Sequence, residues 1–534
     1  MLMAVCVVAG VLIGTFYSNH FSGTRLNVVN LGSNRLNNLL HIIDDQYVDA
    51  VDLDSLTEQA LPLILSNLDP HSIYVSAKDA KVVEDDLKAS FSGIGVEFVI
   101  RDDTVNIMNV VKNGPADRVG VLAGDKIVTV DGKKFTGKKV TNEEAMKNLK
   151  GPSGTKVVIG VKRYGGGGIR TFTITRAEVP RKSIGAAYMI DEATGYIRIK
   201  SFAENTYPEL LIALAKLSGE GAENLVIDLR DNTGGYLASA VQICNEFLPK
   251  GRVITYTEGR KSPREEYRSD GRGAYQDIPM VVLINEGSAS SSEIFAGAMQ
   301  DNDRATIIGR RSFGKGLVQQ QIDFSDGSFI RLTVARYHTP SGRYIQKPYG
   351  EYGDDLANRY EHGEFFSKDS IKHSGPEYHT VGGRTVYGGG GITPDIFVAE
   401  DTIGMTSYYK QAVISGLVLQ YAYGYADANR AKLSSFGSAG EMAAYMGRQG
   451  IVEKFADYAE KNGLKRRNIL IRQSHSMLEF VITSRVVYNI LDEEQWNEFI
   501  NTKDNTIEEA LAVFQRGDAF PKLPQKGKVR NAKK

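Results

Sequence analysis

The chain has 534 residues, and its 64 lysines and arginines balance 64 aspartates and glutamates. Hydrophobic residues make up 42% and charged residues 24%, which is typical of folded globular proteins and excludes a largely disordered chain or one with many membrane spans. Nucleic-acid binding needs a basic surface, and a net charge of zero gives no electrostatic reason to propose one, so we expect no nucleic-acid partner. The length predicts roughly three or four domains.

Segment 1–17 is predicted to contact a membrane. It carries no charged side chain, but it is shorter than the roughly 20 residues needed to cross a bilayer. Such a run is typical of a signal-peptide core or a short anchor, and the lack of an A-x-A-like cleavage site after it favours an uncleaved anchor. We therefore expect an exported protein on the periplasmic side of the cell envelope, anchored to the inner membrane.

The next two regions differ in the period of their apolar residues. Region 18–90 repeats apolar residues every three to four positions, which predicts helices. Region 91–178 has short apolar runs separated by Asn-Gly, Asp-Gly and Gly-Pro turns, which predicts a compact β-rich domain. Its expected strands are 93–100, 105–111, 126–130, 157–161 and 171–175.

Region 179–400 has the pattern of an α/β core. Strand 225–229 leads through a turn into helix 236–248, and strand 280–284 leads in the same way into helix 291–300. Ligand and catalytic groups collect at such strand-to-helix turns. The remaining expectations are a polar, glycine-rich excursion at 348–391, a helical region at 401–520 and a basic, disordered tail at 521–534.

Region 285–321 offers three chemical interpretations. The pattern G-x-x-x-x-G-K at 309–315 matches part of a phosphate-binding loop, but Gly316 occupies the place of the Ser or Thr that holds magnesium, and a strand-like run follows. The pattern S-x-x-K at 312–315 occurs in penicillin-recognising enzymes, but their S-D-N and K-T-G motifs are absent. Both interpretations therefore lack partners that their chemistry requires.

The third interpretation pairs Ser290 with Lys315. Ser290 lies at a strand-to-helix turn, and a serine hydroxyl becomes a nucleophile when a base removes its proton. A lysine can be that base when it is buried among apolar residues, because burial disfavours its charged form. The spacing of Ser290 and Glu293 is also that of a helix-capping box, and from this spacing alone the cap is favoured.

Six motifs follow one another along the chain. They are LDPHS (68–72), DLRDNTGG (228–235), NEGSASSSE (285–293), SFGKGLVQ (312–319), ARYHTPSG (335–342) and GITPD (391–395). In content and order this series resembles the carboxy-terminal processing peptidases, the tail-specific proteases of the S41 class. Ser291 and Ser312 stand where the family usually has Ala and Thr, and the stretch 348–391 is longer than the family pattern predicts.

The resemblance implies a serine endopeptidase that forms an acyl-enzyme. Ser290 would be its nucleophile, Lys315 its general base, and Gln319 the residue that orients the lysine. With Lys315 as the base, His338 is expected to be a structural neighbour of the site.

The resemblance also implies an oxyanion hole made of backbone N–H groups. These would belong to Ser291 and to either Gly235 or Gly234, and such donors stabilise the charge that develops on the attacked carbonyl. No cofactor is implied. The histidines show no metal-ligand spacing, so we expect no metal.

Region 91–178 then resembles a PDZ domain, and the predicted fold class is a multidomain α/β protein with helical N- and C-terminal regions. Gly93, Ile94, Gly95 and Val96 would form the loop that binds the free C-terminus of a protein or peptide substrate, which joins the sheet as an added strand. A contrasting hypothesis is a catalytically silent scaffold that only binds such peptides, with Ser290 as a helix cap. The sequence leaves open a homo-oligomer or an activating adaptor.

Overall fold

The computed structural model describes residues 35–80, 90–101, 103–137, 140–163, 167–350, 352–372 and 375–523. The predicted membrane segment 1–17 and most of the predicted tail 521–534 lie outside these residues. Within the described part, no helix is both long and apolar enough to span a bilayer.

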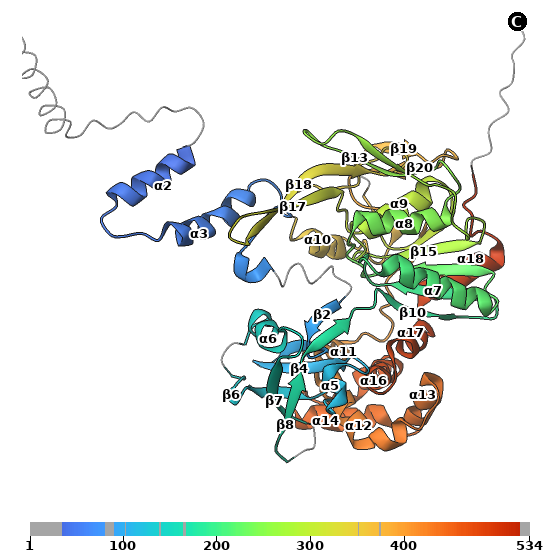
Figure 1. Ribbon diagram of the computed structural model, residues 1–534. Helices are drawn as coiled ribbons and strands as arrows, with labels where there is room; N and C mark the ends of the chain where they lie inside the picture. Colours follow the sequence, from blue (N-terminus) through green and yellow to red (C-terminus); the bar gives the residue numbers. More distant parts are fainter. Residues whose placement is uncertain are drawn as a thin grey trace, which may run out of the picture.

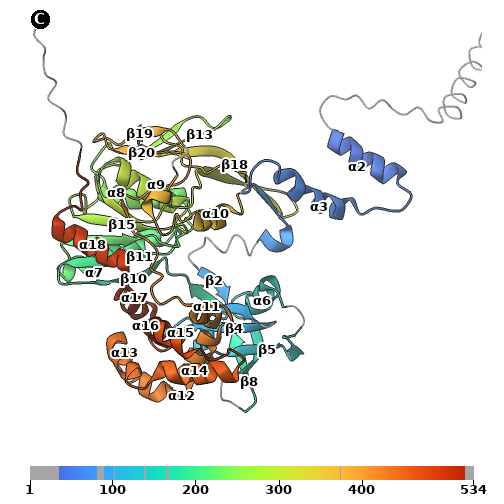
Figure 2. The same cartoon turned by 180° about the vertical axis from the view of Figure 1, so that it is seen from behind.

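A central α/β core carries a β-rich domain and a group of C-terminal helices, which lie together on one side of it (Figure 1). Two N-terminal helices, α2 (Arg35–Gln46) and α3 (Leu53–Leu65), extend away from the core in both views (Figures 1 and 2). The predicted fold class, a multidomain α/β protein with helical regions flanking the domains, is confirmed.

A six-stranded sheet forms the centre of the core. Its order is β10-β11-β12-β15-β16-β21, and all neighbours are parallel except β10 and β11. The strands are β10 (Ile184–Met189), β11 (Thr194–Ile199), β12 (Asn224–Asp228), β15 (Met280–Ile284), β16 (Thr306–Gly309) and β21 (Ile396–Phe397). β12 and β15 correspond to the two predicted strands. Strands that are covered on both faces are apolar throughout, and this made both of them recognisable in the sequence.

Helices cover both faces of this sheet. On one face, α7 (Thr206–Gly219), α8 (Leu237–Phe247) and α9 (Ser291–Asp301) bury the largest apolar cluster of the described chain. On the other face, α18 (Asn505–Arg516) packs its buried side chains against the strands. A helix from the predicted C-terminal region thus completes the core.

A second, antiparallel sheet is built around one long strand, β18 (Phe329–His338). Strand β17 (Leu317–Asp323) pairs along one edge of β18, whereas β1 (Ile73–Val75) and β13 (Val253–Glu258) share its other edge. β14 (Glu265–Arg268) continues the sheet beyond β13. The N-terminal region therefore supplies a strand to the sheet that also contains β17, which follows Lys315.

The β-rich domain has a sheet of order β3-β4-β5-β7-β8, with β3 at its edge. The strands are β3 (Val96–Arg101), β4 (Thr104–Val110), β5 (Lys126–Val130), β7 (Lys156–Lys162) and β8 (Ile169–Thr175), with β6 (Lys133–Lys134) beside β5 and helices α5 (Pro115–Arg118) and α6 (Asn142–Leu149). A short ladder of β2 (Ser90–Gly93) and β9 (Ala177–Pro180) closes the domain where the chain enters and leaves it.

The C-terminal helices have an apolar core of their own. They are α11 (Ser407–Ile414), α12 (Leu417–Leu433), α13 (Ala439–Gly447), α14 (Ile451–Lys461), α15 (Asn468–Gln473), α16 (His475–Ile490) and α17 (Glu493–Asn501). The hydroxyl of Tyr488 donates to Glu97 Oε2 at 3.0 Å in the β-rich domain, and Glu494 pairs with Lys216 of the core at 2.9 Å. The helices therefore join the β-rich domain to the core.

The stretch 348–391 folds back over the core. It contains α10 (Asp355–Glu361), a 3₁₀ turn (Lys368–Ser370) and the hairpin of β19 (Glu377–His379) and β20 (Thr385–Tyr387). Buried Glu364 accepts from the guanidinium of Arg311 at 2.6 Å, and Arg359 donates to the carbonyl of Arg311 at 2.7 Å. These contacts fix the stretch beside residues 312–315.

Candidate active site

Ser290 lies in the turn between β15 and α9, half-buried, with φ 56° and ψ −113°. Residues other than glycine rarely adopt this backbone conformation, and the strain persists only where surrounding contacts enforce it. Here Ser288 Oγ donates to the carbonyl of Leu229 at 2.7 Å, and Asn285 Oδ1 accepts the N–H of Asp231 at 2.8 Å. The turn after β15 is thereby tied to the turn after β12.

The glycine pair Gly234 and Gly235 packs directly against this turn. A Cβ atom at Gly234 would lie 2.8 Å from the Cβ of Ser290, and one at Gly235 would lie 2.1 Å from the carbonyl oxygen of Phe202. Both residues also have positive φ angles, 102° and 149°. Ser291 Oγ donates to the carbonyl of Gly235 at 2.9 Å, so the serine at this position adds a link that an alanine lacks.

The N–H groups of Gly234 and Gly235 differ in whether they have a hydrogen-bond partner. The N–H of Gly234 donates to Asn232 Oδ1 at 2.9 Å. In the described part of the chain, the N–H groups of Gly235 and Ser291 make no hydrogen bond. Ser291 is the first residue of α9, so its N–H has no partner within the helix. Two free backbone donors beside a strained serine fit a site for a developing negative charge.

Lys315 follows Gly314 at the start of the loop into β17, and its side chain is half-buried. Burial lowers the pKa of Lys315 from its ordinary value, and the positive charge of Arg331 lowers this pKa further. The carboxylates of Glu293 and Asp69 act on the pKa in the opposite direction. A lower pKa increases the fraction of the lysine that is neutral and able to accept a proton.

Gln319 connects this lysine to the N-terminal region. Lys315 Nζ donates to Gln319 Oε1 at 3.1 Å, and Gln319 Nε2 donates to the backbone carbonyl of His71. The two bonds use both ends of the amide, so they fix which end faces the lysine.

Glu293 is fully buried and links the loop of Ser290 to the loop of Lys315. Its Oε2 accepts the N–H groups of Ser290 and Lys315, both at 2.9 Å. Its Oε1 accepts the N–H of Gly314 at 2.7 Å and the hydroxyl of Ser312 at 2.6 Å. The capping-box spacing predicted the bond to Ser290, but no local pattern indicated the three bonds to residues 312–315.

Tyr337 is a second link that the sequence did not indicate. Its buried hydroxyl lies 2.5 Å from the carbonyl oxygen of Lys315 and 3.2 Å from that of Ser290. Among the described residues, no hydrogen bond joins the side chains of Ser290 and Lys315 directly. The two loops are thus held together through Glu293 and Tyr337.

The other polar side chains of these motifs have structural contacts. His338 stacks on Tyr256 with ring centroids 4.6 Å apart, and its Nδ1 lies 3.2 Å from the carbonyl of Gly342. Ser312 has no exposed surface, which leaves it inaccessible as the nucleophile of an S-x-x-K site. The element that follows Lys315 is strand β17, whereas a phosphate-binding loop would be followed by a helix.

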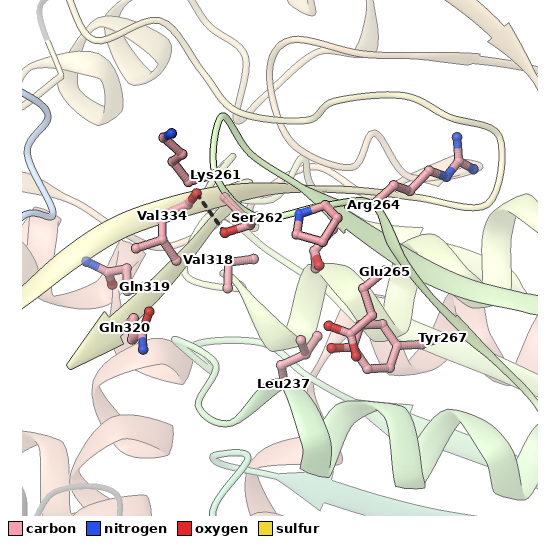
Figure 3. Close-up of a pocket in the computed structure, with 13 residues that line it drawn as sticks. Leu237, Lys261, Ser262, Arg264, Glu265, Tyr267, Val318, Gln319, Gln320 and Val334 are labelled. Carbon is pink, nitrogen blue, oxygen red and sulfur yellow. Dashed lines mark hydrogen bonds between the residues drawn. The ribbon is translucent and has the colours of Figure 1, made fainter. Parts of the chain in front are cut away.

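A cavity of about 640 Å³ opens beside Gln319. Figure 3 shows Leu237, at the start of α8, facing Val318 and Gln319 across it. Its apolar lining includes Leu237, Pro263, Val318, Val334 and Ala335, and its polar lining includes Gln319, Gln320, Glu265 and Tyr267. The cavity therefore lies between the start of α8 and the strand that carries Gln319.

The predicted peptide-binding loop lies in the β-rich domain, apart from this site. Gly93, Ile94 and Gly95 are buried, and half-buried Val96 begins the edge strand β3. The carbonyl groups of Ile94 and Gly95 accept from Ala116 at 2.9 Å and Val111 at 3.0 Å, which fixes the loop against the domain.

Three family models match the chain. Peptidase family S41 matches 193–352, the PDZ domain matches 92–175, and a family of unknown function (DUF8443) matches 408–492. The first match covers both loops joined by Glu293, the second covers the β-rich domain, and the third covers the helices from α11 to α16.

The chain is also similar to curated relatives and to a solved structure. The chain is 38% identical to a carboxy-terminal-processing protease of Bartonella bacilliformis, over 58% of this chain and 72% of the relative. It is 36% identical to carboxy-terminal processing protease CtpB of Bacillus subtilis, over 57% of this chain and 64% of the relative. It is 26% identical to the solved photosystem II D1 C-terminal processing protease, which matches 69% of this chain and 93% of its own with a TM-score of 0.37.

Proposed function

We propose that this chain, which belongs to the carboxy-terminal processing peptidases of family S41, cleaves peptide bonds with a Ser290–Lys315 dyad. Members of this family are serine peptidases, and this chain also contains a PDZ domain. The observation that carries this proposal is the joint placement of a strained serine, two free backbone donors beside it and a half-buried lysine on the linked loop.

The chemistry follows from these groups. Neutral Lys315 takes the proton of the Ser290 hydroxyl, and the serine oxygen attacks the substrate carbonyl carbon. The resulting oxyanion accepts hydrogen bonds from the N–H groups of Ser291 and Gly235, and removing one such donor costs about 2.7–4 kcal/mol in other serine peptidases. Protonated Lys315 then gives its proton to the leaving amine, and the carbon–nitrogen bond breaks to leave an acyl-enzyme.

Water completes the cycle. Lys315, neutral again, takes a proton from water, the hydroxide attacks the ester carbon, and Ser290 regains its proton as the ester breaks. Gln319 Oε1 holds Lys315 Nζ in place in both halves of the reaction. Of the two glycine donors predicted from the sequence, the proposal takes Gly235, since Asn232 already uses the N–H of Gly234.

Substrate choice is proposed to involve two sites. The loop of Gly93 to Val96 receives the C-terminal carboxylate, and the chain end adds to the free edge of β3. The cavity beside Gln319 receives a side chain near the scissile bond, and its lining of Leu237, Val318 and Val334 favours an apolar one. The substrates are then exported proteins with accessible C-termini, and the enzyme acts on the periplasmic side of the cell envelope, anchored through segment 1–17.

The test is cleavage of a quenched fluorescent peptide with an apolar C-terminal tail and a free carboxylate. We expect Ser290→Ala and Lys315→Ala to melt within a few degrees of the wild type and to lose cleavage. Ser435→Ala and Lys410→Ala, which change exposed residues of the C-terminal region, should keep it. Retained cleavage in either dyad variant would reject the dyad. Unchanged peptide binding without cleavage in any form would favour the catalytically silent scaffold.

A further inference from the structure

The turn at residues 68–72 reaches the candidate active site from outside the region that the S41 model matches. It precedes β1, which pairs with β18 from Ile73↔Arg331 to Val75↔Phe329. The carbonyl of His71 accepts from Gln319 Nε2, and this is the contact that fixes the Gln319 amide. The LDPHS motif therefore contributes a backbone group to the site, although no catalytic role attaches to its side chains in the proposed mechanism.

Asp69 organises this turn. Its Oδ1 accepts the N–H groups of His71 at 2.8 Å and Ser72 at 2.9 Å, and its Oδ2 accepts the Ser72 hydroxyl at 2.7 Å. Both Asp69 and Ser72 are buried. A buried carboxylate with this many donors fixes the backbone conformation of the turn.

Thr333 joins the turn to the strand that carries Gln319. Thr333 Oγ1 donates to Asp69 Oδ1, and the Thr333 N–H donates to Ser72 Oγ, both at 3.2 Å. In the ladder between β17 and β18, Thr333 is the partner of Gln319. The turn and the glutamine are therefore held in register by one residue of β18.

We propose that Asp69 is a positioning residue for the dyad, which it serves by holding the His71 carbonyl where it orients the Gln319 amide toward Lys315. The inference rests on the proposed function. Without the His71 carbonyl, the terminal torsion of Gln319 has two comparable orientations, and one of them presents the amide NH₂ to the lysine. That orientation removes the acceptor that holds Nζ.

The test compares Asp69→Ala with a matched control, Asp326→Ala. Asp326 makes the same kind of turn at the end of the β17–β18 hairpin, where it accepts the N–H of Ser328 at 2.9 Å and its hydroxyl at 2.7 Å. We expect Asp69→Ala to lower kcat for the fluorescent peptide about 10- to 100-fold with KM little changed, the loss that a small misplacement of a catalytic group causes. Asp326→Ala should keep the wild-type kcat.

A double-mutant cycle separates positioning from a general structural role. If Asp69 acts through Gln319, adding Asp69→Ala to Gln319→Ala causes no further loss of kcat, because the group being oriented is already gone. Asp69→Asn should keep most of the activity that Asp69→Ala loses, since its amide oxygen still accepts from the turn. Multiplying losses in the double variant, or a wild-type kcat for Asp69→Ala, would overturn the inference.

Two further variants keep the outcomes distinct. If Asp69→Ala is unfolded at the assay temperature, Ser72→Ala, with Ser328→Ala as its control, replaces it under the same criteria. Full activity of Lys315→Ala and Gln319→Ala would reject the proposed function itself. A loss in those two variants beside wild-type behaviour of Asp69→Ala rejects only the role of Asp69.

Discussion

The carboxylate of Glu293 allows the sharpest prediction, because it holds both catalytic loops. Its two oxygens accept from three backbone N–H groups and from Ser312, and none of it is exposed. In Glu293→Gln one oxygen becomes an NH₂ group, which faces at least one N–H that previously had an acceptor. A buried unpaired donor costs about 1–3 kcal/mol, and bonds to the remaining neutral oxygen lose the strength that the charge gave them.

We expect Glu293→Gln to lose about 2–4 kcal/mol of folding free energy, after a partial offset because a buried charge no longer has to be desolvated. Burial raises the pKa of Glu293, while its four hydrogen bonds lower it, which is consistent with such an offset. The matched control is Glu246→Gln. Glu246 is equally a buried glutamate, accepting from Ala274 N–H at 2.7 Å and the Tyr207 hydroxyl at 3.1 Å, but it touches neither catalytic loop.

The kinetic effect has two components with separate signs. The displaced loops lower the plateau value of kcat, whereas removal of the Glu293 charge lowers the pKa of Lys315 and moves the acid limb of the pH–rate profile to lower pH. Thermal melts and rates between pH 5 and pH 9, about two units on each side of neutrality, measure both. A wild-type plateau in Glu293→Gln, or an acid limb that moves to higher pH, would refute this reasoning, as would an equal loss of kcat in Glu246→Gln.

Three other predictions follow from single contacts. In Arg331→Gln the lysine loses a nearby positive charge, so the pKa of Lys315 rises and the acid limb of kcat/KM moves to higher pH; an unmoved limb would contradict this. Gly235→Ala places a Cβ 2.1 Å from a backbone carbonyl, and we expect a lower melting temperature and loss of cleavage together. Asn489→Asp keeps the oxygen that accepts from Arg430 at 2.7 Å but sets a second carboxylate oxygen against the Ala123 carbonyl, now 3.2 Å from the amide; we expect faster hydrogen exchange in the loop around Ala123 while the core keeps its protection.

Local patterns predicted most of the fold. β5 and β15 lie at the predicted bounds, and α9 ends one residue beyond its predicted end, because alternation, apolar runs and caps are properties of neighbouring residues. The short β2–β9 ladder was not predicted, since its strands are brief and their pairing is set only when the domain closes. The stretch 348–391 forms a hairpin of its own outside the core sheet, and its packing over residues 312–315 depends on contacts of Arg359 and Glu364 with Arg311, which lies outside the stretch.

The candidate site divides in the same way. Ser290, Lys315 and Gln319 stand in short motifs with recognisable spacing, so the sequence indicates them. The bonds of Glu293 to residues 312–315, the bridge of Tyr337 and the His71 carbonyl depend on tertiary contacts, and all three involve backbone groups that any residue type supplies. No sequence pattern specifies an acceptor that is a main-chain carbonyl.

The C-terminal region has two structural roles, and this determines how its function can be tested. Helices α12 and α16 contact the PDZ domain through Tyr423 and Tyr488, whereas α18 buries its apolar face on the core sheet. Removing everything after residue 400 would expose that face of the sheet, and each aliphatic side chain uncovered costs about 1.5–3 kcal/mol. Loss of activity in such a truncation would therefore report on core stability. Substitutions at Tyr488 and Asn489, which leave α18 in place, isolate the part of the region that positions the PDZ domain.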